Sequence, residues 1–209
     1  MPASTPHAAE AARDVPGLLQ LASRCRLCPD VTPPPVLWAS PGQRALLVGQ
    51  APGAAELGIA LPFQGRAGRT LRGWLAPLGV GSDEDFRRLF AICATALCFP
   101  GPSPGGRGDR APSRVERERC RPWSTALLRL LEPTLIVPVG RLAIDDWVGR
   151  APLTEVVGRR FERDGRAVVP LPHPSGASAW TNDPANRALV ARAVELVAAA
   201  HPALVGQAR

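Results

Sequence analysis

Lysine is absent from this 209-residue sequence, so arginine carries every positively charged side chain and sets the net charge of +7. Enzymes that work through a Schiff base need an amine nucleophile, and no lysine side chain is available for that chemistry here. The excess of positive charge favours a polyanionic partner such as nucleic acid. A solvated arginine-rich surface is the alternative explanation of the same charge.

Long apolar runs are missing as well. No run reaches the roughly 18 residues that a membrane-spanning helix needs. Residues 1–14 do not combine a basic start with an apolar block, as a secretory signal does. We therefore expect no membrane partner and a cytoplasmic location. Apolar residues still make up 45% of the chain, enough for a buried core, and we expect a flexible tail over residues 1–14 and a single monomeric domain over residues 15–209.

The apolar patterns predict strands that alternate with helices. Strands are expected at about residues 44–50, 89–97, 135–139 and 167–171. Helices are expected at about residues 15–27, 66–78, 113–131, 140–148 and 184–200, with a small excursion or hairpin over 153–163. This alternation argues for a three-layer α/β/α sandwich around a central, mainly parallel four-stranded sheet. A Gly-, Pro- and Arg-rich loop over residues 99–113 is long enough to suggest a functional role.

Two turns rich in glycine and proline mark a candidate cleft. Residues 49–56 read GQAPGAAE directly after the first strand, and residues 62–68 read PFQGRAG. Residues 173–176 read HPSG and follow the last strand. Ligands bind at the carboxyl ends of the strands in open α/β sheets, so we expect the two turns to share one cleft.

Cysteine spacing suggests a metal site. Cys25 and Cys28 form a C-x2-C pair, and Cys98 and Cys120 lie near the two ends of the long loop. In a cytoplasmic protein such a set favours zinc or an iron–sulfur cluster over disulfides. Unrelated buried thiols are the alternative, and Cys93, inside an apolar strand, is expected to be a core residue.

Together these motifs resemble the uracil-DNA glycosylase superfamily, most closely its iron–sulfur family 4 and family 5 enzymes. Residues 49–56 are similar to the family 4 motif G-E-x-P-G-x-x-E, residues 62–68 to P-F-V-G-x-A-G, and residues 173–175 to H-P-S. The resemblance runs from about residue 20 to residue 200. Four cysteines in the same order hold a [4Fe–4S] cluster in these families. The resemblance therefore implies that Cys25, Cys28, Cys98 and Cys120 hold one here, with zinc as the alternative.

The resemblance implies a monofunctional glycosylase that hydrolyses the N-glycosidic bond of uracil, or of another deaminated base, in DNA during base-excision repair. It makes Glu56 the catalytic carboxylate and places His173 against the negative charge that develops on the leaving base. The residues expected to bind the extruded base are Gln50 and Ala51 through their backbone amides, Phe63 by stacking, and the residue at position Ala94. The residues expected to contact the DNA strand are Gly65, Arg66, Ser175, Gly176 and Ser178.

Three positions depart from the family pattern. Gln50 stands where family 4 carries glutamate, and Ala94 stands where many members carry the asparagine that reads uracil. Ala177 stands where some members place a leucine wedge. These departures favour two alternatives: a non-catalytic nucleic-acid-binding module of the same fold, and a glycosylase for a different damaged base such as hypoxanthine.

Overall fold

The computed structural model describes residues 7–105, 108–175 and 179–201. Its strands form one sheet in the order β2-β1-β3-β5-β4. The central strand β1 pairs in parallel with β2 and β3, β3 pairs in parallel with β5, and β4 runs antiparallel to β5. The strands are β1 Ala45–Gly49, β2 Ala91–Ala94, β3 Leu135–Pro138, β4 Phe161–Arg163 and β5 Arg166–Val168.

The sheet has five strands, one more than we expected. The additional strand, β4, forms the edge of the sheet as a hairpin with β5, and the turn places Gly165 at φ +72°. From the sequence we expected only an excursion or hairpin over residues 153–163. Strand β4 was not recognised as a separate strand because it is three residues long and two of them are exposed. A short polar edge strand lacks the apolar pattern by which the buried strands were found.

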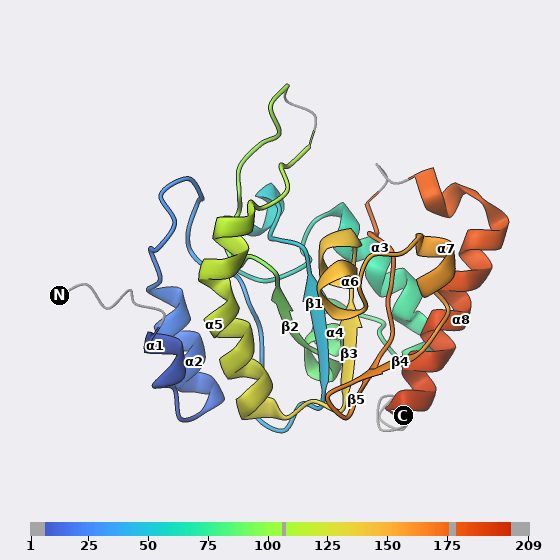
Figure 1. The fold of residues 1–209 in the computed structure, drawn as a ribbon, viewed down its shortest axis with the longest axis horizontal. Helices are drawn as coiled ribbons and strands as arrows, with labels where there is room; N and C mark the ends of the chain where they lie inside the picture. The colour runs from blue at the N-terminus through green and yellow to red at the C-terminus, as the bar shows by residue number, and fades with distance from the viewer. Residues whose placement is uncertain (1–6, 106–107, 176–178, 202–209) are drawn as a thin grey trace.

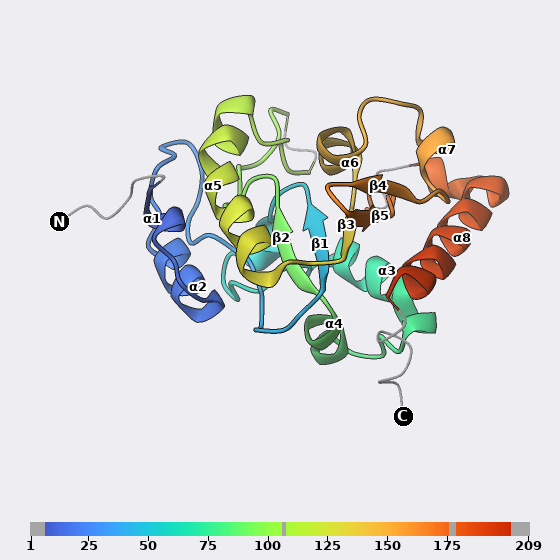
Figure 2. The same cartoon turned by 60° about the horizontal axis from the view of Figure 1, so that its bottom comes forward.

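Helices cover both faces of the sheet, which confirms the expected three-layer sandwich (Figures 1 and 2). Side chains alternate along β1: Ala45 and Leu47 pack into one apolar cluster, whereas Leu46 and Val48 pack into the other. The first cluster includes α3 (Arg66–Leu75), α4 (Asp83–Leu89) and α8 (Pro184–Ala200). The second includes α1 (His7–Glu10), α2 (Val15–Ser23) and α5 (Arg114–Leu131). The remaining helices are α6 (Arg141–Trp147), α7 (Leu153–Val156) and the 3-10 turns η1 (Ala54–Glu56), η2 (Ala76–Leu78) and η3 (Ala179–Asn182).

The N-terminal region differs from the expected flexible tail over residues 1–14. From residue 7 the chain packs against α5, with Ala9 fully buried and Ala12 only 4% exposed. The Arg129 guanidinium donates a hydrogen bond of 2.7 Å to the Ala12 carbonyl oxygen. Residues 1–6 lie outside the described residues. The sequence did not predict that this segment packs on α5, because alanine, its main residue, contributes little to an apolar pattern.

The long loop between β2 and α5 ends in the predicted helix cap. The Ser113 hydroxyl accepts the Glu116 amide, and the Glu116 carboxylate accepts the Ser113 amide in return. The loop projects beyond the amino end of α5, where the carboxyl ends of the central strands also lie (Figure 1). Within the described ranges, no helix has the length and apolar character that crossing a bilayer requires.

Candidate active site

A cleft of about 540 Å³ opens at the carboxyl ends of β1 and β2. Its volume lies within the range of small-molecule sites. The turn after β1, the segment leading into α3, the end of β2 and part of the long loop all contribute to it. The cleft is lined by every described residue that we expected to bind base or DNA or to act in catalysis: Gln50, Ala51, Glu56, Phe63, Gly65, Arg66, Ala94, His173 and Ser175. Gly176 and Ser178, together with Ala177, lie outside the described residues.

Glu56 is buried, and its carboxylate is bound by three backbone amides. Oε2 accepts a 2.7 Å hydrogen bond from the Gly53 amide, and Oε1 accepts hydrogen bonds of 2.7 and 3.1 Å from the Gln64 and Gly65 amides. Only 6% of the residue is exposed. The side chain therefore fastens the turn after β1 to the start of α3, across the loop that lies between them.

Phe63 adopts a backbone conformation that is rare for an aromatic residue, with φ +58°. Helix α3 approaches so closely that a Cβ on Gly68 would lie 1.7 Å from the Phe63 carbonyl oxygen. The Arg72 guanidinium donates to the same oxygen at 2.9 Å. The ring itself lies against Gly49, where a Cβ would be 3.1 Å from Phe63 Cζ. Because neither Gly49 nor Gly68 has a side chain, the Phe63 ring and backbone fit between them at the cleft wall.

His173 lies on the cleft with its Nδ1 atom already engaged. The Ser175 amide donates to Nδ1 at 3.2 Å, and the Ser175 hydroxyl lies 2.8 Å from the same atom. An Nδ1 that accepts a backbone N–H leaves the proton of a neutral ring on Nε2. Burial lowers the pKa of His173 and so favours this neutral form. The ring is backed by Gly140, where a Cβ would lie 3.0 Å from His173 Cδ2.

The end of β2 supports the first turn and shapes the cleft floor. The Thr95 hydroxyl donates to the Gln50 carbonyl oxygen at 2.7 Å, and the Thr95 amide donates to the Gly49 carbonyl oxygen at 3.0 Å. Ala94, which precedes it, faces the cleft with a methyl group. A methyl group offers no hydrogen bond, so the side chain at position 94 cannot read a polar ligand.

Asp109 and Arg110 also line the cleft, and the sequence analysis did not single out Asp109. Arg110 pairs with the buried Glu116, with 2.6 Å between Nη2 and Oε1, and this pairing lowers the pKa of Glu116 to about 2. Asp109 is the only acidic residue in the loop over residues 99–113. A single carboxylate in an otherwise uncharged or basic loop could have drawn attention to Asp109 in the sequence. Its place at the cleft is evident only from the fold, which brings the loop back to the turn after β1.

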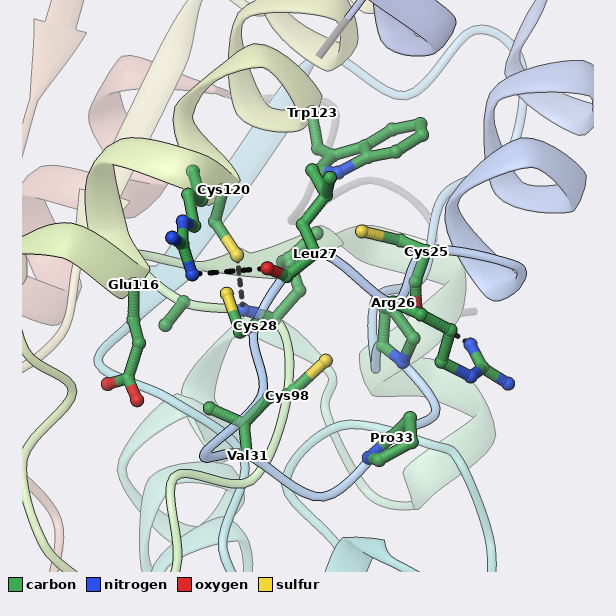
Figure 3. Close-up of a pocket in the computed structure, with 14 residues that line it drawn as sticks. Cys25, Arg26, Leu27, Cys28, Val31, Pro33, Cys98, Glu116, Cys120 and Trp123 are labelled. Carbon is green, nitrogen blue, oxygen red and sulfur yellow. Dashed lines mark hydrogen bonds between the residues drawn. The ribbon is translucent and has the colours of Figure 1, made fainter. Parts of the chain in front are cut away.

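The four cysteines of the predicted metal site border one pocket between α5 and the segment after α2 (Figure 3). Burial raises the pKa of Cys98 to about 12 and that of Cys120 to about 11. The Leu97 amide lies 3.4 Å from Cys120 Sγ as a hydrogen-bond donor. Cys93 is buried and does not border this pocket, as expected of a core residue.

This set of sulfur donors fits a soft metal in its chemistry, because four cysteines from three separate segments suit zinc or an iron–sulfur cluster. Their side chains are not gathered into a coordination shell. In the part of the chain that the structure describes, no three His, Cys, Asp or Glu side chains lie close enough together to hold a metal ion. The structure thus brings the cysteines to one pocket without fixing a ligand geometry.

The sequence was also compared with known protein families and proteins. A sequence model described as the uracil DNA glycosylase superfamily matches residues 38–198. The chain is 32% identical over 120 residues to a type-4 uracil-DNA glycosylase of Pyrobaculum aerophilum, covering 57% of this chain and 53% of that protein. It is 29% identical over 135 residues to a type-4 uracil-DNA glycosylase of Thermotoga maritima, covering 63% and 65%.

A third relative is a DNA polymerase of Bacillus phage SP01. It is 27% identical over 111 residues, which cover 53% of this chain and 11% of the phage protein. The chain spans less than two thirds of the length of either glycosylase that it matches.

Proposed function

Because this chain belongs to the uracil DNA glycosylase superfamily, we propose that it removes uracil, or another deaminated base, from DNA by hydrolysing the N-glycosidic bond. The observation that carries the proposal is the cleft at the carboxyl ends of β1 and β2. One hollow there gathers a neutral imidazole, carboxylates and an aromatic ring from segments more than 100 positions apart in the sequence.

Each of these groups matches a demand of the reaction. Breaking the N-glycosidic bond leaves positive charge on the sugar and negative charge on the base, and both need electrostatic stabilisation. His173 donates from Nε2 to the carbonyl oxygen on which the negative charge develops. The carboxylates of Glu56 and Asp109, which lie near Gly53, stabilise the positively charged sugar and bind the attacking water. Without lysine the reaction stops at the abasic site, since no side-chain amine can form a Schiff base.

The base must leave the duplex to reach this cleft. Phe63 offers a stacking face, which is worth about 1–3 kcal/mol and tolerates any base. The backbone amides of Gln50 and Ala51 bind the base carbonyl, while Ala94 adds no side-chain contact to it. We therefore expect a broader choice of deaminated bases than an asparagine at position 94 would allow, with hypoxanthine as the leading alternative to uracil.

The DNA strand runs along the rim of the cleft. Arg66 begins α3, and the backbone N–H groups of that first helical turn can bind phosphate. Gly65 and Ser175 line the same cleft. Arg110, whose guanidinium is paired with Glu116, borders the cleft on the loop side. The net charge of +7 supports binding to DNA that weakens as salt rises.

The cysteine pocket is the proposed site of the cofactor. Cys25, Cys28, Cys98 and Cys120 would hold a [4Fe–4S] cluster, with zinc as the alternative. Bound there, the group would supply a structural cross-link. It would join the segment after α2 and the segment after β2 to α5, and so would support the base of the long loop. We propose that the protein acts as a monomer in the cytoplasm.

Alkaline cleavage of DNA tests the proposed activity. Purified protein is incubated with single-stranded and mispaired duplex oligonucleotides that carry uracil, hypoxanthine or xanthine, and the products are heated in alkali. We expect strand cleavage at the damaged base only after alkali. Intact strands with all three bases would contradict a glycosylase.

A binding module without turnover is the second candidate, and Gln50 and Ala94 favour it because each removes a contact expected of the family. It predicts salt-sensitive DNA affinity in the same samples with no alkali-labile site. The two candidates therefore differ in base release and agree in DNA binding.

A further inference from the structure

Two carboxylates flank Gly53, at the turn that follows β1. The point at which a Cβ on Gly53 would lie is 2.9 Å from Asp109 Oδ2 and 3.1 Å from Glu56 Oε2. One carboxylate comes from the turn itself and the other from the long loop before α5. Both residues line the cleft that also holds His173. The site therefore offers two candidates for the group that handles the attacking water.

The two carboxylates differ in what already binds them. Three backbone amides occupy Glu56, which is buried. Asp109 is exposed, and within the described ranges no hydrogen bond or ion pair engages its side chain. A carboxylate has about four acceptor positions, and amide hydrogen bonds already fill three of those on Glu56. The exposed Asp109 carboxylate keeps its acceptor positions open for a water molecule.

The loop holds Asp109 in place through its neighbours. The Arg110 guanidinium binds both oxygens of Glu116 and donates to the Asp30 carbonyl oxygen at 2.8 Å. The Arg110 amide donates to the Gly101 carbonyl oxygen at 3.0 Å, and Asp109 pairs with Pro102 across the loop. The residue after Asp109 is thus anchored to a buried carboxylate and to the opposite strand of the loop. This support keeps the Asp109 side chain beside Gly53.

We propose that Asp109 is the catalytic carboxylate that holds and deprotonates the attacking water, and that Glu56 is a positioning residue. The inference rests on the proposed glycosylase function. The water oxygen bonds to the anomeric carbon of the sugar as the N-glycosidic bond breaks. The bonding electron pair leaves with the base, whose charge the His173 Nε2–H group stabilises. The proton from water passes to Asp109, and the base later takes a proton from solvent.

Single-turnover rates of base release separate the two roles. Asp109→Asn keeps the size of the side chain and removes its charge, so we expect the rate to fall by about 100-fold or more while DNA affinity stays within about threefold. Asp109→Ala should be equally impaired, and added formate should restore at least about a tenth of the lost activity by supplying a carboxylate in the cavity. Asp164→Asn, at the exposed β4–β5 turn, is the matched control and should release base at the wild-type rate.

Glu56→Gln provides the comparison for a positioning role. It should lower the midpoint of thermal unfolding together with the rate, and formate should not restore its activity. An Asp109→Asn rate within about threefold of wild type, or an Asp109→Ala variant that formate does not restore, would overturn the assignment. A wild-type protein that releases no base from any substrate would instead remove the proposed function, and the assignment would fall with it.

Discussion

At the scale of single residues, the proposed activity depends on where the His173 ring points. Its Nδ1 atom is bound by Ser175, and its other face rests on Gly140, which has φ +88° and no side chain. A small displacement of a catalytic group can reduce a rate by about 100-fold. Gly140 therefore helps to set the orientation of the ring, together with the hydrogen bond from Ser175.

Gly140→Ala tests this placement. The new Cβ would lie 3.0 Å from His173 Cδ2, so the ring must shift, and we expect base release to slow by about 10- to 100-fold with DNA binding retained. Gly149→Ala is the matched control, because Gly149 has a similar φ of +92° and its Cβ would meet no atom within 4 Å. Equal rates for the two variants would show that backbone strain, and not contact with the imidazole, determines the effect.

The pH dependence of base release tests the protonation state of His173. Burial lowers its pKa below the ordinary 6.5, so the imidazole remains neutral above that pH and gains a proton only below it. Protonation places a hydrogen on Nδ1 that opposes the Ser175 amide hydrogen and displaces the ring. We therefore expect the single-turnover rate to be level above pH 6.5 and to fall as the pH drops further. His173→Gln retains an N–H donor that does not titrate, so its lower rate should lack this fall. A wild-type rate that increases on acidification would contradict a neutral donor.

At the scale of secondary structure, α3 and the loop before it act as one unit. Gly68 lets the helix touch the Phe63 carbonyl oxygen, and Arg72 binds the same oxygen. The unusual φ of Phe63 lies at this point of contact. Backbone strain of this kind persists only where the surroundings impose it, and it clusters at functional sites.

Gly68→Ala should break this unit. A Cβ placed 1.7 Å from a backbone oxygen forces the helix and the loop apart, so we expect a loss of about 1–3 kcal/mol in the free energy of unfolding and a large loss of activity. Gly73→Ala, in the same helix, would meet no atom within 4 Å and should stabilise the protein by about 0.5–1 kcal/mol. Urea unfolding measures both, and similar values for the two variants would contradict the contact.

The sequence predicts the elements with strong apolar patterns and misses those without them. The buried strands and the long helices α3, α5 and α8 appear near their expected positions, because burial imposes a regular spacing. Strand β4 was expected only as part of an excursion or hairpin, because it is short and polar. Helix α1 was not expected, because it consists mainly of small residues without an apolar pattern. The place of Glu56 and His173 in one cleft could be predicted because each belongs to a motif that follows a strand. Asp109 was not, since its place beside Gly53 depends on the path of a loop that has no pattern of its own.

At the scale of the whole molecule, the cysteine pocket joins segments that are far apart in the chain. It lies beside the helical layer of α1, α2 and α5, and Glu116, which anchors Arg110 of the cleft, borders the same pocket (Figure 3). A cofactor held there would therefore stabilise both the N-terminal helices and the loop that carries Asp109.

Removal of one cysteine tests this arrangement. Protein purified without oxygen should absorb near about 400 nm and contain iron, and Cys120→Ala should lose both together with some of its resistance to proteolysis. Cys93→Ala is the control, because Cys93 is a buried thiol that lies outside the cysteine pocket. Zinc without colour would select the alternative metal. Neither iron nor zinc in the wild-type protein would contradict a metal site.

The central claim is that the two turns at the carboxyl edge of the sheet form one site that detaches a base from DNA. Mass spectrometry of the products from a uracil-containing single strand tests it most directly. We predict free uracil and an unbroken strand with one abasic sugar, and neither product with His173→Ala. A strand of unchanged mass after incubation with the wild-type protein, or equal uracil release by the variant, would contradict the account.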